Sequence, residues 1–276
     1  MSTRAEPLDR LRARIARLGA PLCLGIDPHP DALPDGLPPD IGGVETFARG
    51  LVEAAAEHAA AVKVNLAFFE AFGSAGWAVV ERLASDLPSD HFLIIDAKRG
   101  DIGTSAERYA AALLGQLGAD AVTVSPYLGE DAVEPFLAYA GRVVYLLVRT
   151  SNPSAGRVQD LPVGGVPLHE HVARWAAERW TDGRVGLVVG ATAPGELARL
   201  RALAPGLGFL VPGAGAQGGD LDAALAHCHG TLAPGLVNVS RGIAAAARGA
   251  DWRATAAAVT RDWLVRMQEA GATLPA

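Results

Sequence analysis

The sequence predicts an α/β fold, a single-domain (β/α)8 barrel (TIM barrel), on three observations. Half of the 276 residues are hydrophobic, short β-rich runs alternate with helical segments, and polar residues gather where those runs end. An α/β barrel takes about 250 residues as one unit, and no shift in composition marks a second domain within 1–276. An open, doubly wound sheet is the alternative fold.

Eight short apolar runs are the predicted strands. Continuous apolar strands that alternate with helices are typical of a parallel sheet covered on its outer side. The runs span 21–27, 61–66, 91–98, 120–125, 142–150, 184–192, 207–213 and 235–241. Intervening helices are expected at 45–59, 75–85, 105–117 and 168–180.

The amino-terminal segment is rich in arginine, as transit peptides are. Its leucine and isoleucine residues recur at helical spacing, however, and Glu6 and Asp9 are acidic. We therefore expect an amphipathic helix of the mature fold at about 6–18. No apolar run approaches the roughly 18 residues needed to span a bilayer, so we expect a cytoplasmic protein with no membrane partner.

Charge and cysteine content exclude several classes of function. The formal charge is −6, and no dense cluster of basic residues is present, which disfavours binding to a nucleic-acid polymer. The two cysteines, Cys23 and Cys228, match neither a disulfide framework nor the spacing of metal ligands. We expect both to be buried as small apolar residues, and we expect no metal site.

Polar residues follow most of the predicted strands. Active sites of (β/α)8 barrels are built at the carboxyl ends of the strands, so these residues are candidates for a common site. Two connections, 28–44 and 151–167, are long for this fold. Because long connections are usually functional or disordered, and 151–167 starts at a polar strand end, we predict that it forms a lid.

The third strand ends in the motif DAKRGD at 96–101. Side chains two apart in a strand share a face, which places the alpha carbons of Asp96 and Lys98 about 6.5–7 Å apart. Asp101 follows in the loop, and Thr104 with Glu107 has the spacing of a helix capping box. A lysine flanked by carboxylates stays protonated, which suits an acid or an electrostatic clamp. The alternative is a structural ion pair.

Two neighbouring strands add further charge. Lys63 comes from the second strand and Asp27 from the first, which makes a row Asp27–Lys63–Asp96–Lys98 around the barrel mouth plausible. Taken alone, Asp27 before a proline could form an Asx turn, and Lys63 could be a cation that reaches solvent.

A glycine-rich loop follows the seventh strand. Gly213, Gly215 and Gly218 fit the pattern G-x-G-x-x-G, but no acidic residue follows on the next strand and too few strands remain for a dinucleotide-binding unit. Barrels often bind phosphate with the loops after strands seven and eight. Gln217 and Arg241 would then supply side-chain donors. A tight turn and a salt bridge at a helix start are the structural alternatives.

Together these motifs resemble the orotidine 5′-phosphate decarboxylase family, specifically its longer bacterial class (type 2). The resemblance covers nearly the whole chain, and DAKRGDI is its most specific part. The motifs occur in the order of the family: GIDPHP at 25–30, KVN at 63–65, DAKRGDI at 96–102, SPYLG at 125–129, TSNPSA at 150–155, VPGAGAQGGD at 211–220 and SRG at 240–242. Ser125 departs from the asparagine expected in this class.

The resemblance implies a carboxy-lyase that converts orotidine 5′-phosphate to UMP and CO2 in pyrimidine biosynthesis, with no metal or organic cofactor. Lys98 would donate the proton, Asp96 would lie beside the departing carboxylate, Lys63 would join the charge network, and Asp27 would lie near the ribose hydroxyls. A fixed ammonium would stabilise the negative charge that decarboxylation builds on a ring carbon.

The resemblance also implies a homodimer with sites at the subunit interface. Asp101 and Ile102 would reach the neighbouring site, and Thr104 or Ser105 would touch the ribose from across the interface. Ser151 would contact the pyrimidine edge. The phosphate would be held by residues of the last two loops, namely Pro212, Gly213, Gln217 and Arg241.

Three other functions stay open at this point. A metal-dependent sugar-phosphate decarboxylase or aldolase on the same barrel would need an acidic residue where this chain has Lys63. A Schiff-base aldolase would use Lys98 or Lys63 as the amine. A non-catalytic protein could bind a phosphorylated ligand without transforming it.

Overall fold

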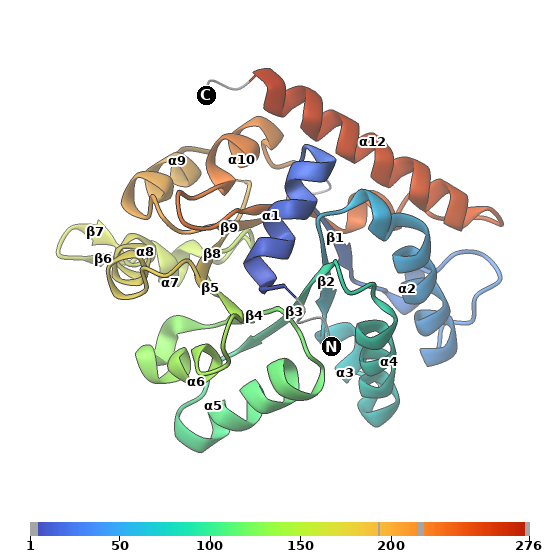
Figure 1. The fold of residues 1–276 in the computed structure, drawn as a ribbon, viewed down its shortest axis with the longest axis horizontal. Helices are drawn as coiled ribbons and strands as arrows, with labels where there is room; N and C mark the ends of the chain where they lie inside the picture. The colour runs from blue at the N-terminus through green and yellow to red at the C-terminus, as the bar shows by residue number, and fades with distance from the viewer. Residues whose placement is uncertain (1–4, 193, 215–217, 274–276) are drawn as a thin grey trace.

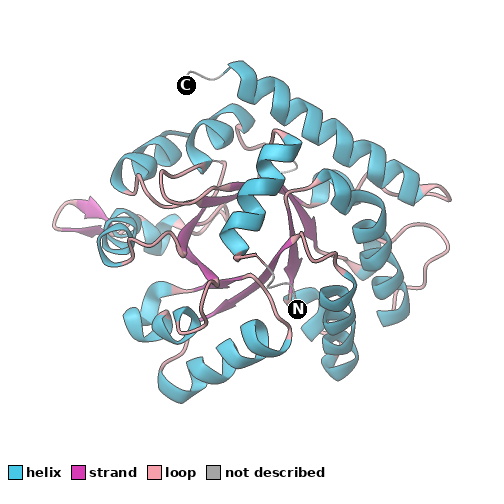
Figure 2. Ribbon diagram, in the orientation of Figure 1, coloured by secondary structure: helices cyan, strands magenta, loops and turns pink. Residues whose placement is uncertain are grey.

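The computed structural model describes residues 5–192, 194–214 and 218–273, and within them eight parallel strands close into a barrel. Helices surround the strands (Figures 1 and 2). The strands follow one another around the barrel in the order β1-β10-β9-β8-β5-β4-β3-β2, and β1 pairs with both β2 and β10. The predicted barrel is thus confirmed, and the open sheet is excluded.

Each predicted run corresponds to one strand, although β3 extends one residue beyond its run, and most strands end before the polar residues that closed the run. The eight strands are β1 (Leu22–Ile26), β2 (Ala61–Asn65), β3 (Phe92–Arg99), β4 (Ala121–Val124), β5 (Val143–Arg149), β8 (Val185–Val189), β9 (Phe209–Pro212) and β10 (Leu236–Val239). The last run was predicted too long, because Arg241 begins a short helix instead of ending the strand.

Each predicted helix is present, but three of the four intervening helices start two to four residues early, and the helices predicted at 45–59 and 105–117 end as α-helix at Ala55 and Ala110. They are α1 (Pro7–Leu18), α2 (Ile41–Ala55), α3 (Ala67–Glu70), α4 (Gly73–Asp86), α5 (Gly103–Ala110), α6 (Glu134–Leu137), α7 (Gly156–Gln159), α8 (Leu168–Arg179), α9 (Pro194–Leu203), α10 (Leu221–Cys228), α11 (Arg241–Ala244) and α12 (Trp252–Thr273). Helix α2 starts early because the Asp40 carboxylate accepts a hydrogen bond from the Gly43 amide.

The predicted capping box at Thr104 and Glu107 is wrong. Helix α5 begins at Gly103, and Ile102, which precedes it, makes no side-chain capping hydrogen bond. A capping residue must flank the helix, whereas Thr104 already lies within the first turn. The connection 151–167 is also more ordered than a plain loop, because it contains α7 and a hairpin of β6 (Pro162–Val163) and β7 (Val166–Pro167) at the periphery (Figure 2).

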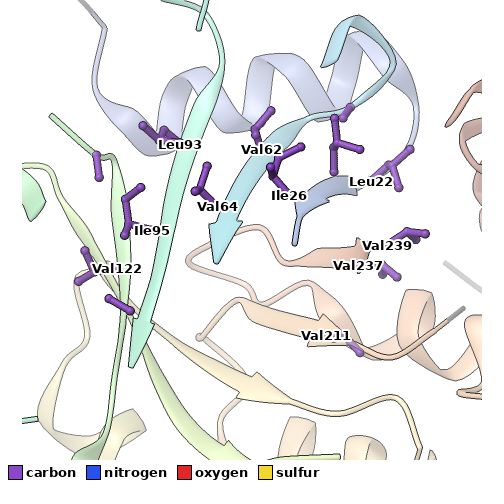
Figure 3. Packing of buried hydrophobic residues seen from close by; sticks show 14 of the residues in the cluster. Leu22, Ile26, Val62, Val64, Leu93, Ile95, Val122, Val211, Val237 and Val239 are labelled. Carbon is purple, nitrogen blue, oxygen red and sulfur yellow. The ribbon is translucent and has the colours of Figure 1, made fainter. Parts of the chain in front are cut away.

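The alternation of side chains along each strand makes two apolar layers. Outward-facing residues pack beneath the surrounding helices, and Figure 3 labels several of them, including Val62, Ile95 and Val237. Inward-facing residues in the first half of the strands, such as Phe92 and Tyr145, fill the barrel interior. Beyond this inner layer, polar groups line the carboxyl-terminal mouth of the barrel.

Helix α1 closes the amino-terminal end of the barrel. Pro7 at its first position and Gly19 after its last, at φ 67°, define its ends. Leu11 of this helix is fully buried against the strand starts, and α1 lies across the barrel in Figure 1. The predicted amphipathic helix is therefore confirmed as part of the fold.

Two further expectations concern chemistry away from the mouth. Cys23 and Cys228 are both free and buried, as predicted. Within the described residues, no helix combines the length and the apolar character needed to cross a membrane.

Candidate active site

The four predicted charges meet at the carboxyl-terminal mouth of the barrel. The Lys63 ammonium lies 3.6 Å from Asp27 Oδ1 and 3.1 Å from Asp96 Oδ2. The Lys98 ammonium lies 2.6 Å from Asp96 Oδ1. Lys63 therefore stands between two carboxylates, and Asp96 stands between two lysines, which confirms the alternating row that the sequence suggested.

Burial and neighbouring charges act against each other in this row. Burial alone would lower the pKa of the Lys63 ammonium, but Asp27 and Asp96 outweigh it and hold this pKa above its ordinary value. Burial likewise opposes ionisation of Asp96, yet Lys63 and Lys98 more than offset it, so the pKa of Asp96 lies well below its ordinary value. Both groups therefore stay charged at neutral pH.

The backbone at Lys98 is unusual. Its φ of 47° is the one positive value among the non-glycine residues that the structure describes, and the pairing of β3 with β4 shifts register between Ile95 and Arg99. Thr123 of β4 spans this irregularity. Its hydroxyl accepts from the Lys98 amide at 2.9 Å and donates to Asp96 Oδ1 at 2.8 Å. Strained backbone of this kind is typical of functional sites.

A pocket of about 140 Å³ opens beside the charge row. Asp27, Lys63 and Asp96 line one part of it, and Ser151 and Arg241 line the remainder. Its full lining is Asp27, Lys63, Asn65, Asp96, Ser151, Pro212, Gly213, Asn238, Val239, Ser240, Arg241 and Gly242. Lys98 lies outside this lining, with a side chain that is 49% exposed, and reaches the row through Asp96.

The glycine loop borders the same pocket. Gly213, at φ 94°, has a backbone that favours glycine, and its carbonyl accepts from the Gly219 amide at 3.1 Å. A Cβ at Gly219 would lie 2.5 Å from that carbonyl oxygen, so the loop closes only on a glycine. Gly215 and Gln217 lie outside the described residues. Gly213 and Arg241 thus lie together at the pocket, where the phosphate site was predicted.

The predicted site residues after β3 do not reach this pocket within one chain. Asp101 accepts a hydrogen bond from the Ile102 amide, and Ile102 is 53% exposed. Thr104 and Ser105 are exposed on the first turn of α5. Their assignment to a neighbouring subunit's site stays a prediction.

Ser151 is positioned by a network that the sequence did not reveal. The Gln159 side chain accepts from the Thr150 amide at 2.9 Å and donates to the Thr150 hydroxyl at 2.8 Å. Arg149 pairs with Glu196 at 2.7 Å and contacts Asp160 at 3.3 Å. These contacts fasten the start of the 151–167 connection next to the pocket.

Sequence reasoning missed three polar residues of the site. Thr123 touches Asp96, Ser240 donates a hydrogen bond to Asp27 Oδ2, and Asn238 lines the pocket with an amide oxygen that has no hydrogen-bond partner among the described residues. All three point inward from strands β4 and β10 or from their ends. The available signal was the alternation of side chains along the strands, which places Thr123 and Asn238 on the inward face of their strands near the carboxyl ends.

Comparisons with known proteins identify the family of this chain. Residues 20–256 match the family model described as "Orotidine 5'-phosphate decarboxylase / HUMPS family". A protein of Roseiflexus castenholzii with the name orotidine 5′-phosphate decarboxylase is 49% identical over 87% of this chain and 89% of its own length.

Solved structures give the same result for the fold. A structure of a putative orotidine 5′-phosphate decarboxylase from Streptomyces avermitilis superposes with a TM-score of 0.81 at 35% identity, covering 99% of this chain and 98% of that one. UMP synthase of Leishmania donovani gives a TM-score of 0.85 at 39% identity, where 97% of this chain matches 57% of that longer one. The barrel, the site motifs and the length of the match all lead to one assignment: the chain belongs to the orotidine 5′-phosphate decarboxylase / HUMPS family.

Proposed function

We propose that this protein decarboxylates orotidine 5′-phosphate to UMP and CO2 in pyrimidine nucleotide biosynthesis, with no metal or organic cofactor. The alternating row Asp27–Lys63–Asp96–Lys98 at the barrel mouth is the observation that carries the proposal. The relatives that bear the decarboxylase name support it.

The reaction needs a place for developing negative charge and a proton. Loss of CO2 breaks the bond to the ring carbon and leaves the electron pair on that carbon. The Lys98 ammonium then donates a proton there, which completes UMP, and regains a proton from solvent. Because this charge exists only in and after the transition state, a fixed ammonium lowers the barrier. Asp96 holds that ammonium through the 2.6 Å contact.

The pocket supplies contacts for the remainder of the nucleotide. In the proposed complex, Asp27 binds the ribose hydroxyls, Ser151 contacts the pyrimidine edge, and Arg241 holds the phosphate together with the loop at Gly213 and Gln217. The shared pocket lining of Asp27, Ser151, Gly213 and Arg241 supports this arrangement. Contacts remote from the reacting carbon would orient the base toward Lys98.

We further propose that the connection 151–167 covers the pocket when nucleotide is bound. Ser151 lines the pocket, while Val158, Leu161 and Val163 of the same segment are each 50% exposed. Proteolysis within this segment should slow in the presence of UMP. An unchanged cleavage rate would argue against a lid.

The site chemistry disfavours the rival reactions. A divalent metal would need the carboxylates that already share the Lys63 ammonium. A Schiff base needs a neutral amine, whereas the raised pKa of Lys63 keeps that group protonated.

The deciding experiment measures CO2 release from carboxyl-labelled orotidine 5′-phosphate with and without a strong chelator. We expect full activity in both conditions, no borohydride-trapped adduct, and loss of turnover but not of UMP binding in Lys98→Ala. Activity that disappears with chelator would support the metal-dependent alternative. UMP binding without turnover in the parent protein would support a binding protein.

We also propose that the protein acts as a cytoplasmic homodimer of single-domain barrels. Ile102, Tyr127 and Leu128 lie in the loops after the adjacent strands β3 and β4 and are 53%, 82% and 47% exposed, which makes this side a candidate interface beside the pocket. Asp101, Ile102 and Thr104 or Ser105 would then enter the partner's site.

Subunit mixing tests the shared site. Lys98→Ala and Asp101→Ala should each be inactive alone, and their mixture should regain activity because one site of a mixed dimer carries both intact groups. Sedimentation should give twice the mass of one chain. A monomer, or a mixture without recovery, would contradict the shared site.

A further inference from the structure

Lys98 and Asp96, the two groups beside the reacting carbon in the proposed reaction, both contact the hydroxyl of Thr123. Thr123 lies on β4 and is 1% exposed. Its hydroxyl accepts a hydrogen bond from the Lys98 amide at 2.9 Å and donates one to Asp96 Oδ1 at 2.8 Å. The same Oδ1 lies 2.6 Å from the Lys98 ammonium. One hydroxyl therefore contacts the backbone of the proton donor and the carboxylate that holds its side chain.

This contact coincides with the irregular backbone. Between Ile95 and Arg99, strand β3 advances four residues while β4 advances two, from Val122 to Val124. Such a bulge leaves amides without their regular ladder partners. The Thr123 hydroxyl takes the place of such a partner for Lys98, which adopts a φ of 47°. Left-handed backbone at a residue with a Cβ persists only when its surroundings hold it.

We propose that Thr123 is the positioning residue for the proton donor, because its hydroxyl fixes both the left-handed backbone of Lys98 and the rotamer of Asp96. The proposal rests on the decarboxylase function proposed above. Thr123 is buried, and its hydroxyl already contacts the Lys98 amide and Asp96 Oδ1, so it acts through Lys98 and Asp96 and does not touch the substrate. Its loss should therefore affect turnover more than binding.

Thr123→Val tests this most directly, because valine keeps the shape of threonine and removes only the hydroxyl. We expect kcat for CO2 release to fall about 10- to 100-fold, as for the loss of a buried hydrogen-bond partner. KM for orotidine 5′-phosphate, and the calorimetric Kd for UMP, should stay within about threefold of the parent values. Thr123→Ser, which keeps the hydroxyl, should retain kcat within about threefold.

A matched control separates positioning from stability. Thr260 is also fully buried, and its hydroxyl donates to the Ala256 carbonyl of α12 at 2.7 Å, outside the pocket lining. Thr260→Val removes a comparable hydrogen bond and should lower Tm without changing kcat. If Thr123→Val fails to fold, kcat is compared between Thr123→Ala, which lacks the hydroxyl, and Thr123→Ser, which keeps it.

The outcomes are distinct. A parent-like kcat in Thr123→Val, an equal loss of kcat in Thr123→Ser, or an equal loss of kcat in Thr260→Val would each overturn the proposal. A parent protein that releases no CO2 would instead refute the proposed function. A selective loss of kcat in Thr123→Val, restored by serine, would establish Thr123 as a positioning residue.

Discussion

At the amino-terminal end of the barrel, buried charges are held by arginines. Asp120 is fully buried and pairs with Arg10 at 2.6 Å and Arg142 at 2.9 Å, and it also accepts from the Leu93 amide. At the carboxyl-terminal end, the cations are Lys63 and Lys98, and the carboxylates beside them line an open pocket.

The choice of cation distinguishes the two ends. Arginine offers a rigid fork of donors and does not give up its proton, so it suits a structural position. Arg14 illustrates this with hydrogen bonds to the carbonyls of Ala56 and Ala59. Lysine carries a compact charge and can transfer a proton. In a chain where arginine is the usual cation, the only two lysines lie where proton transfer is proposed.

The largest expected effect is a loss of kcat on removing Lys98 from the carboxyl-terminal charge row. Lys98→Ala should reduce kcat by about 10⁴-fold or more, because it removes both the proton donor and the charge beside the reacting carbon. Tm should change little, since this side chain is half exposed. Lys98→Arg is the matched control that keeps the charge but donates a proton poorly. Substantial turnover in Lys98→Ala would remove this residue from the mechanism.

The next largest effect is a loss of stability on removing Asp120 from the buried ion pairs at the amino-terminal end. Asp120→Ala leaves Arg10 and Arg142 without their shared carboxylate, and removing one member of a buried ion pair costs about 3–5 kcal/mol. We expect the free energy of unfolding in urea to fall by that amount, with kcat of the folded protein unchanged. Asp9→Ala, which removes an exposed pair with Arg12, should cost less than about 1 kcal/mol. An equal loss of unfolding free energy in Asp120→Ala and Asp9→Ala would contradict a structural role for the buried pairs of Asp120.

A smaller effect tests the phosphate end of the pocket. Arg241→Ala should weaken UMP binding about 10- to 100-fold, the range for losing a hydrogen bond to a charged group. Binding of uridine, which lacks the phosphate, should not change. Calorimetry of both ligands measures the difference, with Arg248→Ala as an arginine control outside the pocket lining. Equal losses for UMP and uridine would refute the assignment.

The smallest effect is a pH dependence of stability. Burial first, and then Arg14, lower the pKa of His91, against the opposing effect of Asp90. The unfolded chain therefore binds a proton below about pH 6.5 before the folded chain does. The free energy of unfolding should decline from pH 7 to pH 5, and His91→Gln should reduce that slope. The lowered pKa of Asp96 keeps this carboxylate charged over the same pH range. If the slope of stability against pH is unchanged in His91→Gln, His91 is not the source of the pH dependence.

The sequence was sufficient for the barrel and for the charge row. The period of two along eight apolar runs determines which side chains face inward, and parallel strands bring their carboxyl ends to the same edge. Asp27, Lys63, Asp96 and Lys98 could therefore be placed at one mouth without coordinates, and the glycine loop and Arg241 followed from their position after the last two strands.

Only the tertiary structure decided how these groups are held. The bulge that turns Lys98 to φ 47°, the Thr123 hydroxyl beneath it and the Ser240 hydroxyl on Asp27 depend on contacts between neighbouring strands. A side chain's inward direction follows from local alternation, because it repeats along one strand. Its hydrogen-bond partner depends on strand register and on small departures from regular pairing, which are set by the packing of the whole barrel.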